Sequence, residues 1–345
     1  MKKLLLILLA IFFTSITSWA QTELKKPEAS QAAKVSQRIG LTDIEISYHS
    51  PLTKGRTVWG DLVPYGKVWR AGANENTSIS FSTDVKIAGK NLLAGTYGLH
   101  MIPEKDVWTI IFSKNYYSWG SFFYTESEDA LRIKVTPQSC EMQDWLGYYF
   151  TNPAASSVSF ELRWEKLRVP VLVEVDVPET VFQSMQKELV HINGFFWQGY
   201  NQAAAYCVNN NIHLDMAEKW IEKSISIQKN FTNLTTKSKL KTAQNNSAES
   251  EKMAKEAMDL ADESQLNSYG YQLLSQNNNV EAINIFTINV KRYPNSWNVY
   301  DSLAEAYELS GNKKLALNNY KIALSKAPEA QKSRLNETIK KLEKP

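Results

Sequence analysis

The chain has 345 residues, of which 43% are hydrophobic and 22% are charged, and its formal net charge is +3. This length accommodates about two domains. The small net charge excludes a general nucleic-acid binder, because such proteins gather many basic residues on one face.

The first 20 residues predict a secretory signal peptide. Two lysines precede an apolar stretch at residues 4–13, and the small residues Ser18 and Ala20 stand before a predicted cleavage at Gln21. The stretch is shorter than the roughly 20 apolar residues that a membrane span needs. We therefore expect an exported protein, periplasmic or extracellular, that is soluble after cleavage and has no membrane span.

Residues 34–177 predict an all-β domain, preceded by a flexible segment at 21–33. Apolar residues occupy alternate positions, as in the stretches 158–164 and 169–175. About eight to ten short strands with turn signals between them favour an antiparallel sandwich or jelly roll. No helical pattern of ordinary length interrupts them, which disfavours a parallel sheet.

Residues 178–345 change to a helical period and contain an internal repeat. Four pairs of residues of similar size are each separated by 34 positions: Gly270 and Ala304, Ala282 and Ala316, Phe286 and Tyr320, and Pro294 and Pro328. This is the tetratricopeptide period, in which small residues let paired helices approach and proline ends the second helix. We expect about three to four repeats in an all-α solenoid, with an entry helix at 178–191 and a capping helix at 331–342.

The segment 54–75 carries a family resemblance. Its motifs are Lys54-Gly55-Arg56, Trp59-Gly60, Val63-Pro64-Tyr65-Gly66-Lys67-Val68-Trp69-Arg70 and Ala71-Gly72-Ala73-Asn74-Glu75. The sequence resembles the exported bacterial family called domain of unknown function 2911, common in Bacteroidota, over about 33–175. That family is often joined to tetratricopeptide repeats and has no established activity. The resemblance therefore implies compartment and architecture, but no catalytic residue and no cofactor.

A long connection, residues 51–76, is the candidate ligand site, because loops of this length are usually functional or disordered and this one is too apolar for disorder. The aromatic residues would stack on a sugar ring or an aromatic group, the arginines would bind a carboxylate or phosphate, and two polar residues would orient the ligand. The candidates are Arg56, Trp59, Tyr65, Trp69, Arg70, Asn74 and Glu75. Alternatively, the tryptophans plug the end of the sandwich while the arginines stack on them or cap loop carbonyls, and we favour this alternative.

A second aromatic group follows the predicted strand at Trp108. It could form the opposite wall of a groove, although we favour a satellite core beneath a loop. Its members are Tyr116, Tyr117, Trp119, Phe122, Phe123 and Tyr124.

The sequence contains no established catalytic motif: no GxSxG elbow, P-loop, dinucleotide fingerprint or HExxH. The four histidines lack metal-ligand spacing, although His49 and His100 lie at predicted strand ends and could meet. Export would place Cys140 and Cys207 in an oxidising compartment where they could pair, but they fall in different predicted domains and two buried thiols are the simpler expectation. We expect no metal and no cofactor.

These patterns predict a non-enzymatic interaction protein of the periplasm or cell surface. The repeats would bind a protein partner in their groove, and the β domain would bind a glycan or a small anionic ligand. Two alternatives remain open: a carbohydrate-binding module with the repeats as scaffold, and a glycan-active hydrolase with paired carboxylates.

Overall fold

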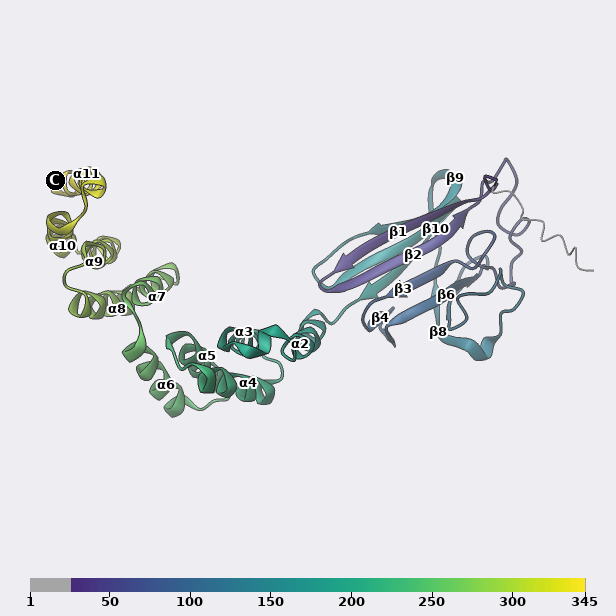
Figure 1. Ribbon diagram of the computed structural model, residues 1–345. Helices are drawn as coiled ribbons and strands as arrows, with labels where there is room; N and C mark the ends of the chain where they lie inside the picture. The colour runs from purple at the N-terminus through teal and green to yellow at the C-terminus, as the bar shows by residue number, and fades with distance from the viewer. Residues whose placement is uncertain (1–25, 345) are drawn as a thin grey trace, which may run out of the picture. The chain divides into compact units, whose positions relative to one another are not determined.

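The computed structural model describes residues 26–344. The predicted signal peptide, residues 1–20, and the start of the predicted flexible segment lie outside the described residues. The chain divides into two compact units, with the boundary between Thr180 and Val181 (Figure 1).

The first unit contains two antiparallel sheets, which confirms the predicted antiparallel β domain (Figure 1). The six-stranded sheet has the order β1 (Gln31–Ile39), β2 (Thr42–Ser50), β3 (Ser78–Phe81), β6 (Gly95–Ile102), β7 (Trp108–Ser113) and β8 (Asp129–Val135). The four-stranded sheet has the order β5 (Lys90–Leu92), β4 (Val85–Ile87), β10 (Ser157–Glu174) and β9 (Gln138–Thr151). A short 3₁₀ helix, η1 (Glu126–Glu128), precedes β8.

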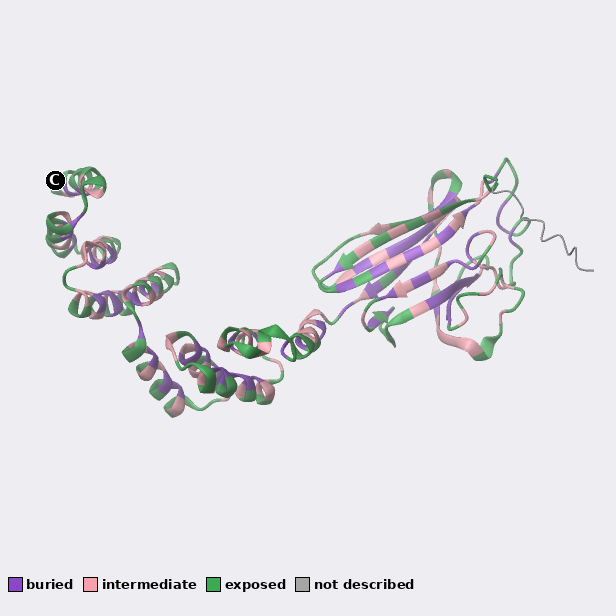
Figure 2. Cartoon of the chain, viewed as in Figure 1, coloured by how far each residue is buried: buried purple, intermediate pink, exposed green. Residues whose placement is uncertain are grey.

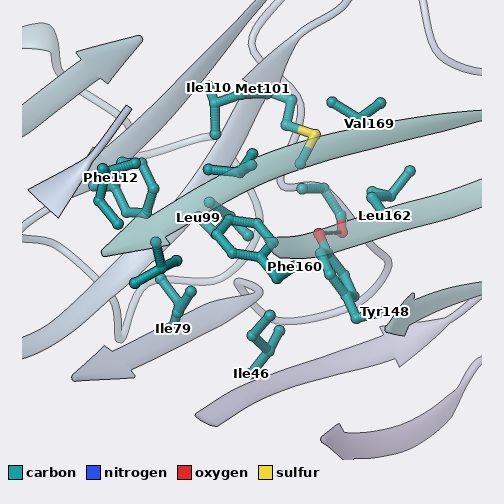
Figure 3. Packing of buried hydrophobic residues seen from close by; sticks show 14 of the residues in the cluster. Ile46, Ile79, Leu99, Met101, Ile110, Phe112, Tyr148, Phe160, Leu162 and Val169 are labelled. Atoms are coloured by element: carbon teal, nitrogen blue, oxygen red, sulfur yellow. Dashed lines mark hydrogen bonds between the residues drawn. The ribbon is translucent and has the colours of Figure 1, made fainter. Parts of the chain in front are cut away.

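One hydrophobic core joins the two sheets. Ile46, Ile79 and Leu99 project from the six-stranded sheet, and Phe160 and Leu162 project from β10 (Figure 3). Figure 2 shows the buried and less buried positions that alternate along β2 and β3. This alternation follows from the two-residue period of a strand, which places successive side chains on opposite faces.

The other face of the six-stranded sheet, here called the outer face, is mostly polar. The strand registers align one row of residues across all six strands: Lys34, Ser47, Ser78, Gly98, Ser113 and Asp129. The two edge strands each carry two basic residues on this face, Lys34 and Arg38 on β1 and Arg132 and Lys134 on β8.

The second part of the chain is helical. It begins with α2 (Val177–Glu188) and η2 (Ile192–Phe195), and it continues with α3 (Trp197–Asn210), α4 (Leu214–Ile227), α5 (Phe231–Ala243), α6 (Ser247–Leu260), α7 (Glu263–Ser275), α8 (Asn279–Arg292), α9 (Trp297–Leu309), α10 (Lys313–Lys326) and α11 (Glu329–Glu343). Helices α3 to α10 pair as four antiparallel hairpins, so the predicted repeat solenoid is confirmed.

The residues repeated at an interval of 34 lie where the helices of a pair meet. Gly270 and Phe286 belong to one hydrophobic cluster, and Ala304 and Tyr320 belong to the next. The second helices α8 and α10 end at Arg292 and Lys326, just before the two repeated prolines. No helix among residues 26–344 is long and apolar enough to cross a membrane.

Candidate functional site

The predicted tryptophans of the 51–76 connection lie in the core. Trp59 is 9% exposed, and its ring packs edge-on against Trp108 at 4.7 Å and against Trp69 at 5.7 Å between centroids. The ring of Trp69 stacks on Trp164 at 6.0 Å, and its Nε1 donates to the Gly72 carbonyl at 3.1 Å. These rings fill the sandwich and leave no free face for a ligand, as the structural alternative predicted.

The two predicted arginines are engaged within the same connection. Arg56 donates from Nε to the Thr53 carbonyl and from a terminal nitrogen to the Leu52 carbonyl, both at 2.9 Å. Arg70 donates to the Asn74 carbonyl at 2.6 Å and places its guanidinium 5.3 Å from the centre of the Trp119 ring. Burial lowers the pKa of Arg70, and the nearby Glu75 partly opposes this effect. Both guanidiniums therefore hold the loop in shape.

Tyr65 is the exposed aromatic residue of the predicted set, at 38% exposure. Its ring lies over Gly60, where a Cβ would come within 2.7 Å of the Tyr65 Cε2 and where φ is +92°. Glycine at this position permits both the backbone conformation and the close approach of the ring. Tyr65 is separated in this way from the buried tryptophans with which it was grouped.

Asn74 and Glu75 turn toward a different place, the end of β2. The Glu75 carboxylate lies 3.3 Å from Nδ1 of His49, and the Glu28 carboxylate lies 3.2 Å from the Nε2 of the same ring. Asn74 Nδ2 donates to the same Glu28 oxygen at 2.7 Å. Two carboxylates from separate segments thus enclose one imidazole.

An open pocket of about 390 Å³ lies next to this imidazole on the outer face. This volume falls in the range of small-molecule sites. We call it the outer pocket. It is lined by Ala32, Ala33, Lys34, Ser47, Tyr48, His49, Glu75 and Asn76.

Asn76 is the residue of this pocket that sequence reasoning missed. It is 8% exposed, its Nδ2 donates to Ser118 Oγ at 2.8 Å, and its Oδ1 accepts no hydrogen bond from the described residues. An amide oxygen buried without a donor is costly unless something else donates to it. The available signal was the alternation in β2, which places Ser47 and His49 on the same face of the sheet.

The second aromatic group is not a satellite core, contrary to the interpretation favoured from sequence. Tyr117, Phe122 and Phe123 are 79%, 75% and 66% exposed. Trp119 stacks on Phe122 with 9° between the ring planes. We call residues 114–125 the aromatic loop. Hydrogen bonds below it hold its backbone, so its rings face solvent.

His100 lies beneath the aromatic loop and is 1% exposed. Its Nδ1 lies 3.1 Å from Ser121 Oγ, and its ring lies 5.2 Å from that of Tyr124. Burial lowers the pKa of His100 to about 4, although the charge of Asp129 opposes the shift. His49 and His100, which the sequence suggested could meet, belong to separate networks of partners.

Metal binding finds no ligand set between residues 26 and 344, where no group of three or more His, Cys, Asp or Glu side chains could hold an ion. Cys140 on β9 is a free thiol, and Cys207 is buried in α3.

The first helices of the repeats carry linked polar side chains. Tyr271 on α7 donates its hydroxyl to a Glu305 carboxylate oxygen on α9 at 2.7 Å. Arg334 on α11 donates to Asp301 on α9 at 2.7 Å. Burial is the main cause that raises the pKa of Tyr271 to about 12, with a further contribution from Glu305. One polar line therefore connects three successive first helices.

Comparison with known proteins identifies the β unit. The model of the family described as "Protein of unknown function (DUF2911)" matches residues 30–173. Curated proteins gave no match. Similar solved structures include the MamA protein, with 15% identity and a TM-score of 0.28 over 46% of this chain and 85% of that chain.

Two further structures carry repeats by their own descriptions. The C-terminal part of a TPR repeat-containing protein from Cytophaga hutchinsonii has 16% identity and a TM-score of 0.30, over 48% of this chain and 67% of that chain. YrrB, a TPR protein with an unusual peptide-binding site, has 17% identity and a TM-score of 0.28, over 48% of this chain and 84% of that chain. The antiparallel β unit of this chain thus belongs to the DUF2911 family of proteins of unknown function, and it is followed here by tetratricopeptide-type repeats.

Proposed function

We propose that this protein is a non-enzymatic interaction protein of the periplasm or cell surface, whose repeats bind a basic, extended protein segment along their first helices. The observation that carries the proposal is the polar line across α7, α9 and α11. Solenoid repeats stack their units so that equivalent side chains recur along one surface.

Hydrogen-bond acceptors recur along this line. Asn267 on α7 and Asp301 on α9 are separated by 34 residues, and an oxygen of each side chain accepts no hydrogen bond from the described residues. An extended segment offers backbone N–H groups at regular intervals, which suits a row of acceptors.

Charge favours a basic segment. Helix α9 carries three carboxylates, Asp301, Glu305 and Glu308, and no basic residue. Arg334 offsets one of them, so the helix retains negative charge toward a ligand. Complementary charge increases the association rate and selects against acidic partners.

The test uses the chain from Gln21 to its end and fluorescein-labelled peptides that are rich in lysine and arginine, with acidic peptides for comparison. We expect the basic peptides to bind and the combined variant Asp301→Asn, Glu305→Gln, Glu308→Gln to bind them about tenfold more weakly or worse. These replacements keep acceptor oxygens and remove charge only.

The control is Glu251→Gln, which removes an exposed carboxylate from α6. It should leave the affinity unchanged. Equal binding of acidic and basic peptides, or equal loss in the control, would contradict the proposal.

Export is the second part of the proposal. It rests on the sequence of the first 20 residues. N-terminal sequencing of the protein recovered from a periplasmic extract or culture medium should begin at Gln21. A retained Met1 in a cytoplasmic fraction would remove this part and leave the peptide-binding proposal intact.

A further inference from the structure

We propose that the outer pocket of the β unit binds a neutral saccharide. This site goes beyond the peptide-binding function of the repeats and does not rest on it. The inference also moves the predicted ligand site away from the buried tryptophans to the outer face beside Glu75 and Asn76.

The floor and rim of the pocket are rigid. Ala32 and Lys34 lie on β1 opposite His49 and Ser47 on β2, in the regular antiparallel register. At the end of β2, His49 is held between the Glu28 and Glu75 carboxylates. Sites on strands with fixed side chains lose little entropy on binding, which favours affinity.

The pocket has more acceptors than donors. Glu75 supplies a carboxylate, and the buried Asn76 Oδ1 has no donor among the described residues. Lys34, the lysine of the lining, is already bound to Glu45 at 2.8 Å. A ligand must therefore donate hydrogen bonds, and sugar hydroxyls both donate and accept.

Charge excludes the small anionic ligand that the sequence suggested for this domain. Glu28 and Glu75 both face the imidazole at the rim of the pocket, at 3.2 and 3.3 Å from its nitrogens. A second anion would be repelled by carboxylates at this distance. A neutral ligand avoids this repulsion.

The aromatic loop extends the site. Asn76 Nδ2 donates to Ser118 Oγ and to the Asn115 carbonyl, so the pocket and the loop share one residue. The loop lies directly on β6, because a Cβ at Gly98 would come within 2.5 Å of the Asn115 carbonyl oxygen. Its exposed rings offer apolar faces on which the C–H face of a sugar ring packs.

The experiment screens the chain from Gln21 to its end against a broad array of neutral glycans, followed by titration calorimetry with the strongest binder. Ala32→Trp blocks the pocket from the exposed edge strand, and Glu75→Gln removes the charge while keeping the shape. We expect Ala32→Trp to weaken binding at least about tenfold, the effect of losing the main contacts of a small ligand.

Ser36→Trp is the matched control, because Ser36 is exposed on the same face of the same strand and does not line the pocket. It should bind the glycan like the unmodified protein, and all variants should keep the same melting temperature. Silence across the whole array, or equal binding by Ala32→Trp, would overturn the proposal. So would binding of putrescine in place of every glycan, since that would make the site an ammonium site.

Discussion

His100 shows how burial sets the charge of a side chain in this protein. Burial lowers its pKa from the ordinary 6.5 to about 4, so the folded state keeps the ring neutral over this interval while the unfolded chain takes up a proton. Stability is then complete above the unfolded pKa and falls as the pH drops from about 6.5 toward 4. The loss amounts to about 3 kcal/mol at most.

This prediction is checked by urea unfolding of the β unit's transition between neutral pH and about pH 4. In the variant His100→Asn, the part of the pH dependence that belongs to this ring should disappear. A variant with the unchanged slope would show that other groups cause the acid sensitivity.

Trp59 separates a structural role from a binding role. Its ring is 9% exposed and contacts Trp69, Trp108 and Trp164. Trp59→Ala should therefore cost about 3–5 kcal/mol of unfolding free energy, as for other large-to-small changes in cores. Tyr65→Ala, at the 38% exposed position, should cost clearly less in the same thermal and denaturant measurements. Equal, small losses at both positions would refute the plug.

The predicted site residues show which part of a site the sequence reveals. Aromatic and basic residues in a long connection were recognised, but composition does not say which rings face the core. The outer pocket depends on Glu28, His49 and Glu75, which come together only because β1, β2 and the following connection are adjacent. A pairing of distant segments leaves no local pattern in the sequence.

Gly270 illustrates packing at the scale of a helix pair. A Cβ at this position would lie 2.5 Å from Cε1 and Cζ of Phe286. Gly270→Ala should destabilise the repeats by about 1–3 kcal/mol through this overlap, partly offset by about 1 kcal/mol from the better helix propensity of alanine.

The double variant Gly270→Ala, Phe286→Leu tests the cause, because leucine is shorter and vacates the contested space. Its unfolding free energy should exceed the sum expected from the two single variants. Strict additivity in this cycle would mean that the two residues do not interact as described.

The helical elements were predictable where small residues recur at the same interval. The pair α7 and α8 and the pair α9 and α10 show this clearly. The earlier pair α5 and α6 carries Thr236 at the position equivalent to Gly270, and Ser250 is the buried small residue of α6. Its repeat is therefore hidden from a search based on glycine and alanine, although the helices form.

At the scale of the whole chain, each compact unit has hydrophobic clusters of its own. Units with separate cores unfold as separate cooperative steps. We therefore expect two transitions in calorimetry, and the acid sensitivity of His100 should move only one of them. A single transition that shifts as a whole with pH would contradict this expectation.

The basic residues on the two edges of the six-stranded sheet have a consequence for association between copies. Open sheet edges are templates for strand addition, and charge on the edge strands is a common protection. Here β1 carries Lys34 and Arg38, and β8 carries Arg132 and Lys134. Copies that meet edge to edge bring like charges together, so the sheet is protected from growing into a fibril even where the folded protein is concentrated.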